Sequence, residues 1–366
     1  MLNLTGSALM STGDLEAALK RFQAALSISR ETGSKQGMST ATNNIANVLL
    51  VRGDLSGARK MYEQAVSLFH EVGDKDYEGY ALNNLASVTT EQGNWLTATK
   101  ISDQALRLFH EVNDKDGMAY ALVGVASALE VHGDIPGARK NYEESLKFAR
   151  ETGDKSIAAY ATYGLCHVEA LAGDLPTAKQ RCLDALGTRQ EMGDKATIAE
   201  TRSRYAELLI EEDQPQEAET LLRQALEQFV AERLSDDEIE GRAILANALA
   251  AQGKTVEAQS EINSAQKLAT KSQNAATRLK LQIVAARQRA RTDTIVKAKD
   301  RLETVRTAAT KYGFVGDELE AELALGELEM NSGKTAAGRL HLTSLQKAAM
   351  ASGFLSISRK AAAAAK

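Results

Sequence analysis

Cysteine, proline and aromatic residues are scarce in this chain of 366 residues, and the scarcities exclude several classes of protein. Two cysteines do not suggest a disulfide framework, so we expect a reducing cytoplasm. Aromatic residues make up only 5%, which suits closely packed helix pairs rather than one large globular core. No run approaches 18 apolar residues, and no basic-then-apolar leader opens the chain, so we expect no membrane insertion and no secretion.

The chain also lacks a large excess of positive or negative charge. The formal net charge is −5 and the isoelectric point is about 5.7. A nucleic-acid-binding domain would carry a basic excess, so we expect no nucleic-acid partner.

A repeat of 40 residues dominates what is present. The stretch from Gly53 to Gly93 is followed by two further copies that begin at Gly93 and Gly133. Every twentieth position from 13 to 353 tends to hold glycine, as at 13, 33, 53, 73, 93, 133, 153, 173, 193, 253, 313, 333 and 353. Glycine adopts the positive φ that ends a helix without steric cost, so two helices fit each period.

Positions spaced 40 residues apart form columns, and each column holds mainly small or mainly bulky residues. One column is Ala18, Ala58, Ala98, Ala138, Ala178, Ala218, Ala258, Ala298 and Gly338. A second small column runs Gly6, Ala46, Ala86, Ala126, Cys166, Ala206, Ala246, Ala286 and Gly326, and a bulky one includes Phe22, Tyr62, Tyr142, Leu222 and Leu342. Small residues let helix axes approach closely, so each copy buries its neighbour.

The pattern Ala46, Ala58, Tyr62, Ala65 resembles the tetratricopeptide repeat, in a long 40-residue form. The chain is similar to the helical-repeat regions of polarity scaffolds and of bacterial signalling regulators. The resemblance implies an all-α fold, a right-handed α-solenoid of about nine tetratricopeptide-like helix pairs. We expect one solenoid over 1–366, with clean repeats at 14–212, degenerate repeats at 213–312, and a final repeat with a capping helix at 313–366.

The first-helix face opposite the buried stripe carries a ladder of tyrosine and asparagine. In the resembled family this helix lines the concave groove, which implies a partner-binding groove of Asn43, Tyr80, Asn83, Tyr120, Tyr160 and Tyr163. The alternative is that these tyrosines pack between adjacent first helices.

Two charged segments allow two interpretations. Residues 207–240 hold twelve acidic residues against Arg223 and Arg233, and residues 267–311 hold twelve basic residues against Asp293, Asp300 and Glu303. Either these are solvated faces that balance each other across neighbouring repeats, or they form a bipolar docking surface for a charged partner.

Residues that could carry chemistry have simpler explanations. Asp74 and Asp76 fit turn capping better than a calcium loop, and His70 and His110 lie one repeat apart, too far to share a metal. Cys166 and Cys182 fall in core columns, where free cysteine behaves as a small hydrophobe. With no phosphate-binding loop or nucleophile elbow, we expect no catalytic residues, no cofactor and no metal, hence no enzyme.

Two functions fit this reading. The first is a scaffold that holds a protein or peptide ligand in the concave groove of the superhelix. The alternative is the sensor or regulatory portion of a larger bacterial signalling protein, a serine/threonine kinase or a winged-helix transcription regulator. Aligned on the period, Met1 falls where the next copy has Ala41, so we expect the chain to be a piece of a longer protein.

Overall fold

The computed structural model describes residues 1–11, 13–289 and 295–366, and every regular element in these ranges is an α-helix. The helices are α1 (Leu2–Ser11), α2 (Leu15–Glu31), α3 (Lys35–Val51), α4 (Leu55–Val72), α5 (Lys75–Glu91), α6 (Trp95–Val112), α7 (Lys115–His132), α8 (Ile135–Thr152), α9 (Lys155–Leu171), α10 (Leu175–Met192), α11 (Lys195–Glu211), α12 (Pro215–Glu232), α13 (Ser235–Ala251), α14 (Thr255–Ala269), α15 (Ala275–Arg289), α16 (Ile295–Tyr312), α17 (Val315–Asn331), α18 (Thr335–Ala351) and α19 (Leu355–Ala364). Consecutive helices pack in pairs, which confirms the all-α solenoid. None of these helices has the length and apolar character that crossing a membrane requires.

The turns between helices follow the glycine ladder. Gly73 ends α4 at φ 74°, and the Asp74 side chain then accepts the backbone N–H of Tyr77 at 3.2 Å, which caps α5. This capping accounts for the Asp74-Lys75-Asp76 run without an ion. Where glycine is missing from the ladder, Asp213 and Arg233 adopt the same left-handed conformation, each at φ 59°.

The core forms where small and bulky columns meet. Ala98 and Ala138 are fully buried, as the small column requires. A Cβ built on Gly6 would lie 2.5 Å from Phe22, and one on Gly326 would lie 2.5 Å from Leu342. The two columns therefore touch at positions sixteen residues apart, across the two helices of one pair.

Cys166 and Cys182 correct one sequence-based prediction, because they form a disulfide rather than two free thiols. Cys166 of α9 occupies the small column and Cys182 of α10 the bulky one, and their Cα atoms are 5.2 Å apart. They are sixteen residues apart, the same separation that brings Gly6 to Phe22. The signal was present in the sequence, since two columns that touch both carry cysteine in this copy.

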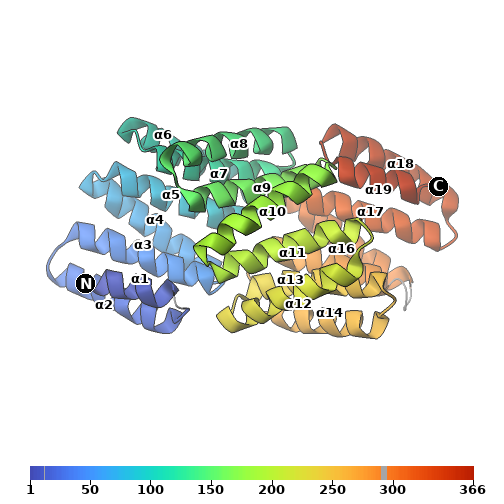
Figure 1. The fold of residues 1–366 in the computed structure, drawn as a ribbon, viewed down its shortest axis with the longest axis horizontal. Helices are drawn as coiled ribbons and strands as arrows, with labels where there is room; N and C mark the ends of the chain where they lie inside the picture. The colour runs from blue at the N-terminus through green and yellow to red at the C-terminus, as the bar shows by residue number, and fades with distance from the viewer. Residues whose placement is uncertain (12, 290–294) are drawn as a thin grey trace.

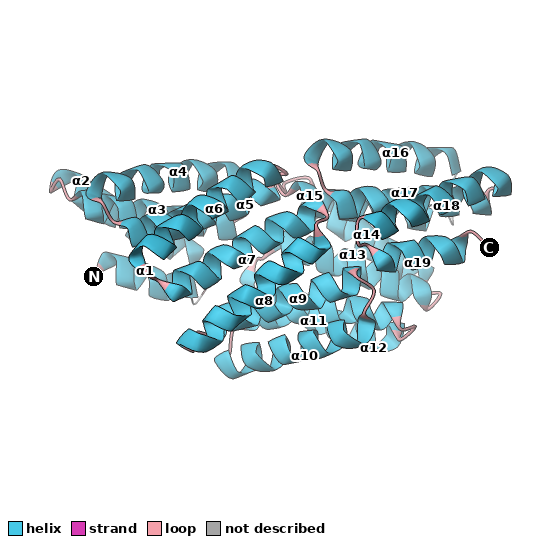
Figure 2. Ribbon diagram, turned by 90° about the horizontal axis from the view of Figure 1, so that it is seen from above, coloured by secondary structure: helices cyan, strands magenta, loops and turns pink. Residues whose placement is uncertain are grey.

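The first, odd-numbered helices form the inner layer of the solenoid. Successive first helices such as α5, α7 and α9 contact one another in addition to their own partners. The stack curves round through α10 and α11 and returns, so that α13–α19 lie alongside α3–α9 (Figure 1). The view from above shows the same two groups of helices next to each other (Figure 2).

Contacts between these two groups close the superhelix. The side-chain oxygen of Gln273 accepts the Ser56 backbone N–H at 3.0 Å, and Arg359 donates to the carbonyl of Gly173 at 2.6 Å. One hydrophobic cluster joins the groups, with Ile135 and Leu165 on one side and Phe354 among the residues on the other. The closure is thus apolar at its centre and hydrogen bonded at its edges.

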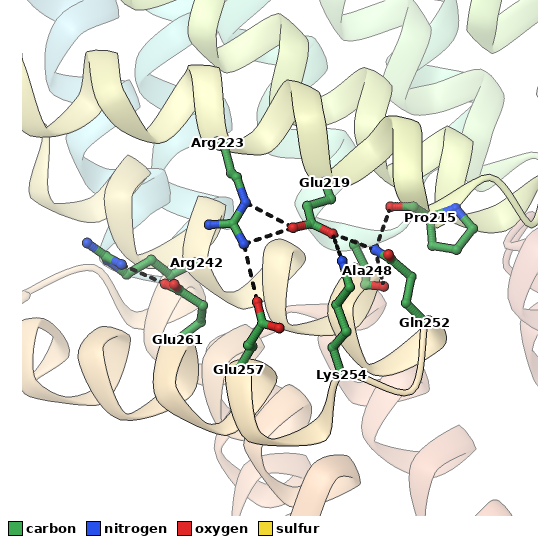
Figure 3. A network of polar contacts seen from close by, with 9 residues as sticks. All are labelled: Pro215, Glu219, Arg223, Arg242, Ala248, Gln252, Lys254, Glu257 and Glu261. Atoms are coloured by element: carbon green, nitrogen blue, oxygen red, sulfur yellow. Dashed lines mark hydrogen bonds and ion pairs between the residues drawn. The ribbon is translucent and has the colours of Figure 1, made fainter.

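Several residues of the two charged segments form ion pairs with neighbours. Glu219 of α12 lies 2.8 Å from Arg223 and 2.8 Å from Lys254, while Arg242 lies 2.6 Å from Glu261 (Figure 3). Hydrogen bonds from Lys254 and other donors lower the pKa of Glu219 to about 2. The pair of Glu240 with Lys280, 3.2 Å apart, joins the acidic segment to the basic one, as balanced faces would, whereas Asp236 and Asp237 have no ion pair among the described residues. The part of the basic segment at 290–294 lies outside the described residues.

Candidate functional site

The inner face of the solenoid carries one residue per repeat at a fixed place on each first helix. We define this face by the column Thr40, Tyr80, Tyr120, Tyr160, Glu200, Glu240, Lys280, Glu320 and Lys360. The 40-residue period puts each of these residues at the same turn of its helix. The chemistry of the column changes midway, from hydroxyl and aromatic groups to charged groups.

The first two tyrosines of the column touch each other. The rings of Tyr80 and Tyr120 have centroids 5.9 Å apart. The Tyr80 hydroxyl donates to Asp114 at 3.0 Å, and the Tyr120 hydroxyl donates to Asn84 at 2.9 Å. Burial raises the pKa of both phenols, and both rings are half-buried. At these positions the tyrosines pack between adjacent first helices, which was the alternative interpretation.

Tyr160 and Tyr163 instead surround a buried arginine. The guanidinium of Arg189 lies 5.1 Å from the ring centroid of Tyr160 and 4.5 Å from that of Tyr163, both cation–π distances. Arg189 is only 1% exposed, and its Nη1 donates to the Glu200 carboxylate at 2.9 Å and to the Thr201 hydroxyl at 2.7 Å. Tyr160 itself remains 42% exposed, and burial raises its pKa to about 12.

Sequence reasoning missed Arg189, although a signal existed. The residues one, two and three repeats away in its column include Phe69, Phe109 and Phe229, all buried. A charged residue in a column of mostly buried apolar residues predicts either a defect or a buried ion pair. The structure shows the ion pair, with Glu200 of the following first helix.

The two asparagines expected in the groove lie in different environments. Asn83 is 4% exposed, and a Cβ on Gly124 of the next first helix would lie 2.5 Å from its Oδ1, so this amide packs between α5 and α7. Asn43 is half-buried, and its Oδ1 has no hydrogen-bond partner among the described residues. Of the six residues expected to bind a partner, Tyr160 is the most accessible.

The second half of the inner face is built from ion pairs between first helices, adjacent ones in two cases and α19 with α11 in the third. Lys280 lies 3.2 Å from Glu240, Arg287 lies 2.9 Å from Glu320, and Lys360 lies 2.6 Å from Glu211. Burial acts to raise the pKa of Glu240, but the charges of Lys280 and Arg204 outweigh it and lower that pKa. The Lys280 side chain is still 42% exposed, so water reaches this face.

Four carboxyl groups of the same region have no ion pair among the described residues. They are Glu91 of α5, Asp236 and Asp237 of α13, and Asp317 of α17. We call these four the unpaired carboxylates. Burial first, and neighbouring carboxylates second, raise the pKa of Asp237 to about 8 and of Glu91 to about 7. Burial likewise raises the pKa of Asp317 to about 7.

The arrangement suits recognition by hydrogen bonds, charge and aromatic faces. Exposed tyrosine, paired charges and unpaired carboxylates lie along one inner layer of helices. Among the residues that the structure describes, no three His, Cys, Asp or Glu side chains converge as metal ligands would. A charged inner face of this kind can hold a ligand along several successive repeats.

Comparisons with known proteins place this architecture among helical repeats. A family model described as the MalT-like TPR region matches residues 84–358, and a tetratricopeptide repeat model matches residues 1–71. Among curated proteins, none matches the sequence. The solved structures supply likeness of fold instead.

Three solved structures share the fold at low sequence identity. A Rap protein complexed with Competence and Sporulation Factor is 12% identical with a TM-score of 0.71, over 99% of this chain and 98% of that one. The Rap conjugation gene regulator of plasmid pLS20, in complex with the Phr* peptide, is 12% identical with a TM-score of 0.64, over 80% and 79%. The apo form of RapI is 13% identical with a TM-score of 0.57, over 74% and 98%.

Proposed function

Because the chain belongs to the family of MalT-like TPR regions, we propose that it is a non-enzymatic module whose inner face binds a peptide or an extended protein segment. The observation that carries the proposal is the inner layer of first helices, where Tyr160 and Lys280 keep more than 40% exposure. One solved structure with the same fold is complexed with Competence and Sporulation Factor and another with the Phr* peptide, which supports a binding role.

The test obstructs the inner face and leaves the fold alone. Ser87 is exposed on α5, seven residues after Tyr80, so Ser87→Trp places a large ring on the inner face. Ser67→Trp on the second helix α4, also at an exposed serine, is the matched control. We expect the Ser87 variant to lose about tenfold or more in affinity for a peptide captured by the wild-type protein, and the control to lose none.

One result would oppose the proposal, and one would require a different variant. Equal capture by the wild-type protein and the Ser87 variant would move the ligand off the inner face. A fall in melting temperature of the Ser87 variant alone would show that Ser87 supports packing, and Tyr160→Ala at the most accessible position would then replace it.

A sensor or regulatory role is the second candidate, favoured by the closure between helix groups. Contacts such as Ser56 with Gln273 join segments more than two hundred residues apart, so a ligand held by both groups would change their separation. Small-angle scattering with and without the ligand tests this role. An unchanged radius of gyration would oppose the sensor role and leave only the scaffold role.

Cytoplasmic localisation stays part of the proposal, and the disulfide provides its test. Disulfides are rare where glutathione keeps thiols reduced. Rapid alkylation during cell lysis should therefore label Cys166 and Cys182 if the protein is cytoplasmic. A pair protected from alkylation would place it in an oxidising compartment.

A further inference from the structure

The inner face has a surplus of negative charge, and we propose that its ligand is an extended peptide segment bearing arginine or lysine side chains, bound by the unpaired carboxylates and the tyrosines beside them. This inference rests on the proposed binding function and adds the chemical class of the ligand. Three independent features of the inner face lead to it.

The first feature is that four cations of the inner face are paired with carboxylates, while Arg278 donates to the Ser272 carbonyl. Lys280 is paired with Glu240, Arg287 with Glu320, and Lys360 with Glu211. Arg204 likewise pairs with Glu207. A ligand carboxylate or phosphate would have to break one of these pairs, so an anionic ligand is disfavoured.

The second feature is that carboxylates from both helix groups lie near one another and have no ion pair among the described residues, although the charges of Arg278 and Lys280 lower the pKa values of Asp236 and Asp317 in part. Glu91 of α5 and Asp236 of α13 belong to opposite sides of the closure, yet each raises the pKa of a neighbouring acid in this cluster. The side-chain amide of Asn274 donates to Glu91 at 3.4 Å, which neutralises no charge. A positively charged side chain placed here would relieve this repulsion and gain charge-assisted hydrogen bonds.

The third feature is that the adjoining wall already holds a guanidinium. Arg189 lies against two tyrosine rings and an acid, Tyr160, Tyr163 and Glu200. Glu200 in turn raises the pKa of Asp237, so the unpaired carboxylates continue directly from this wall. The exposed part of Tyr160 offers a ligand arginine an aromatic face of the same kind.

The spread of the carboxylates argues for a peptide rather than a free amine. Asp237 and Asp317 occur on α13 and α17, and α15 packs between these two helices. First helices packed about 8–10 Å apart put roughly 16–20 Å between them. An extended chain rises about 3.3 Å per residue, so five or six residues cover that span. One small amine reaches only one end.

The experiment uses a matched pair of peptides. The probe is a fluorescein-labelled, C-terminally amidated peptide of sequence Arg-Ala-Ser-Ala-Ser-Ala-Arg, and its twin carries uncharged citrulline at both arginines. Fluorescence anisotropy is measured with the full chain at about pH 8.5 and about 50 mM salt, where most carboxylates are ionised and screening is weak. We expect the arginine peptide to bind about tenfold or more tightly than its twin.

The double variant Asp237→Asn with Asp317→Asn should bind both peptides alike. Its control is Asp103→Asn with Glu227→Gln, which removes the same charge from two exposed residues of second helices. This control should keep the preference for arginine. Loss of carboxylate repulsion should leave the double variant at least as stable as the wild type, so melting curves separate binding from folding.

Three outcomes would overturn the inference. They are equal binding of the two peptides, a preference for arginine that survives in the Asp237/Asp317 variant, and no binding of the arginine peptide below about 1 mM. These outcomes can be told apart from failure of the proposed function. If a neutral peptide binds and Ser87→Trp abolishes that binding, the inner face is a binding site and only its cationic preference is wrong.

Discussion

At the scale of single residues, acids on the inner face are held partly protonated near neutral pH. Burial and like charges raise the pKa of Asp237 to about 8 and of Asp317 and Glu91 to about 7. A carboxyl group in an unfolded chain titrates near pH 4. The native state therefore binds more protons than the unfolded state between these values, and its stability falls as pH rises.

We expect the melting temperature to be higher at about pH 6 than at about pH 8.5. His341 adds to the same trend, because hydrogen bonding to Glu322 raises its pKa and its stabilising charge is lost as pH rises. The pKa of Glu219 is lowered to about 2, so this residue changes the pH dependence of stability only in acid. Differential scanning calorimetry at both pH values makes the measurement, with Asp237→Asn expected to reduce the difference. A melting temperature that rises toward pH 8.5 would contradict this reading of the inner face.

At the scale of elements, helix ends differ between the two halves of the chain. The helices α2 to α11 each follow a Ser, Asp or Asn whose side chain accepts a backbone N–H of the first turn. No such side-chain bond precedes α12, α13, α14, α17, α18 or α19. Each missing cap costs about 0.5–2 kcal/mol, so the second half depends more on packing.

Arg233 ends α12 in a left-handed conformation at φ 59°, where most other copies have glycine. We expect Arg233→Gly to raise the free energy of unfolding by about 1 kcal/mol, because glycine adopts this conformation without steric cost. Urea denaturation of the variant makes the measurement. Arg233→Ala removes the same side chain but keeps the Cβ, so it should give no gain; an equal gain would assign the effect to charge.

Hydrogen exchange should separate the halves as well. Residues 233–311 lack several turn glycines, and α13 and α14 begin without side-chain caps. Solenoid stability is a sum of repeat and interface terms, so we expect amides at 233–311 to exchange before those at 53–193. Faster exchange at 53–193 would show that packing against the first half compensates for the missing caps.

At the scale of the whole molecule, closure brings the turn after α16 against the turn after α5. A Cβ on Gly93 would lie 2.6 Å from Tyr312, and one on Gly313 would lie 2.5 Å from Trp95. Trp95, the one tryptophan of the chain, also stacks on His132 with ring centroids 3.5 Å apart. Its fluorescence therefore reports on this contact.

We expect Tyr312→Ala to loosen the closure, because it removes the ring that covers Gly93. The tryptophan emission should shift to longer wavelength and the radius of gyration should increase, as measured by fluorescence and small-angle scattering. Tyr77→Ala is the control, since that ring is 52% exposed on α5. If both variants leave both signals unchanged, the contact contributes little to closure.

The sequence by itself determined the helices, their ends and the packing within each pair. Turn glycines, capping acids such as Asp74, and columns such as Ala98 act over at most one repeat, where periodicity is a reliable guide. The tyrosines of the inner-face column were also identified from the sequence, which left open whether they bind a ligand or pack between first helices. The disulfide was not predicted, although Gly6 with Phe22 and Gly326 with Leu342 show that positions sixteen apart in these columns touch.

Only the tertiary structure decided which distant repeats meet. The approach of α13–α19 to α3–α9 depends on small rotations summed over many repeats, and no local pattern encodes that sum. It brings Glu91 near Asp236 and aligns the unpaired carboxylates, although each is an ordinary surface acid in its own helix. Tertiary packing likewise placed the guanidinium of Arg189 between Tyr160 and Tyr163, because a side chain buried at a helix end takes its partners from neighbouring helices.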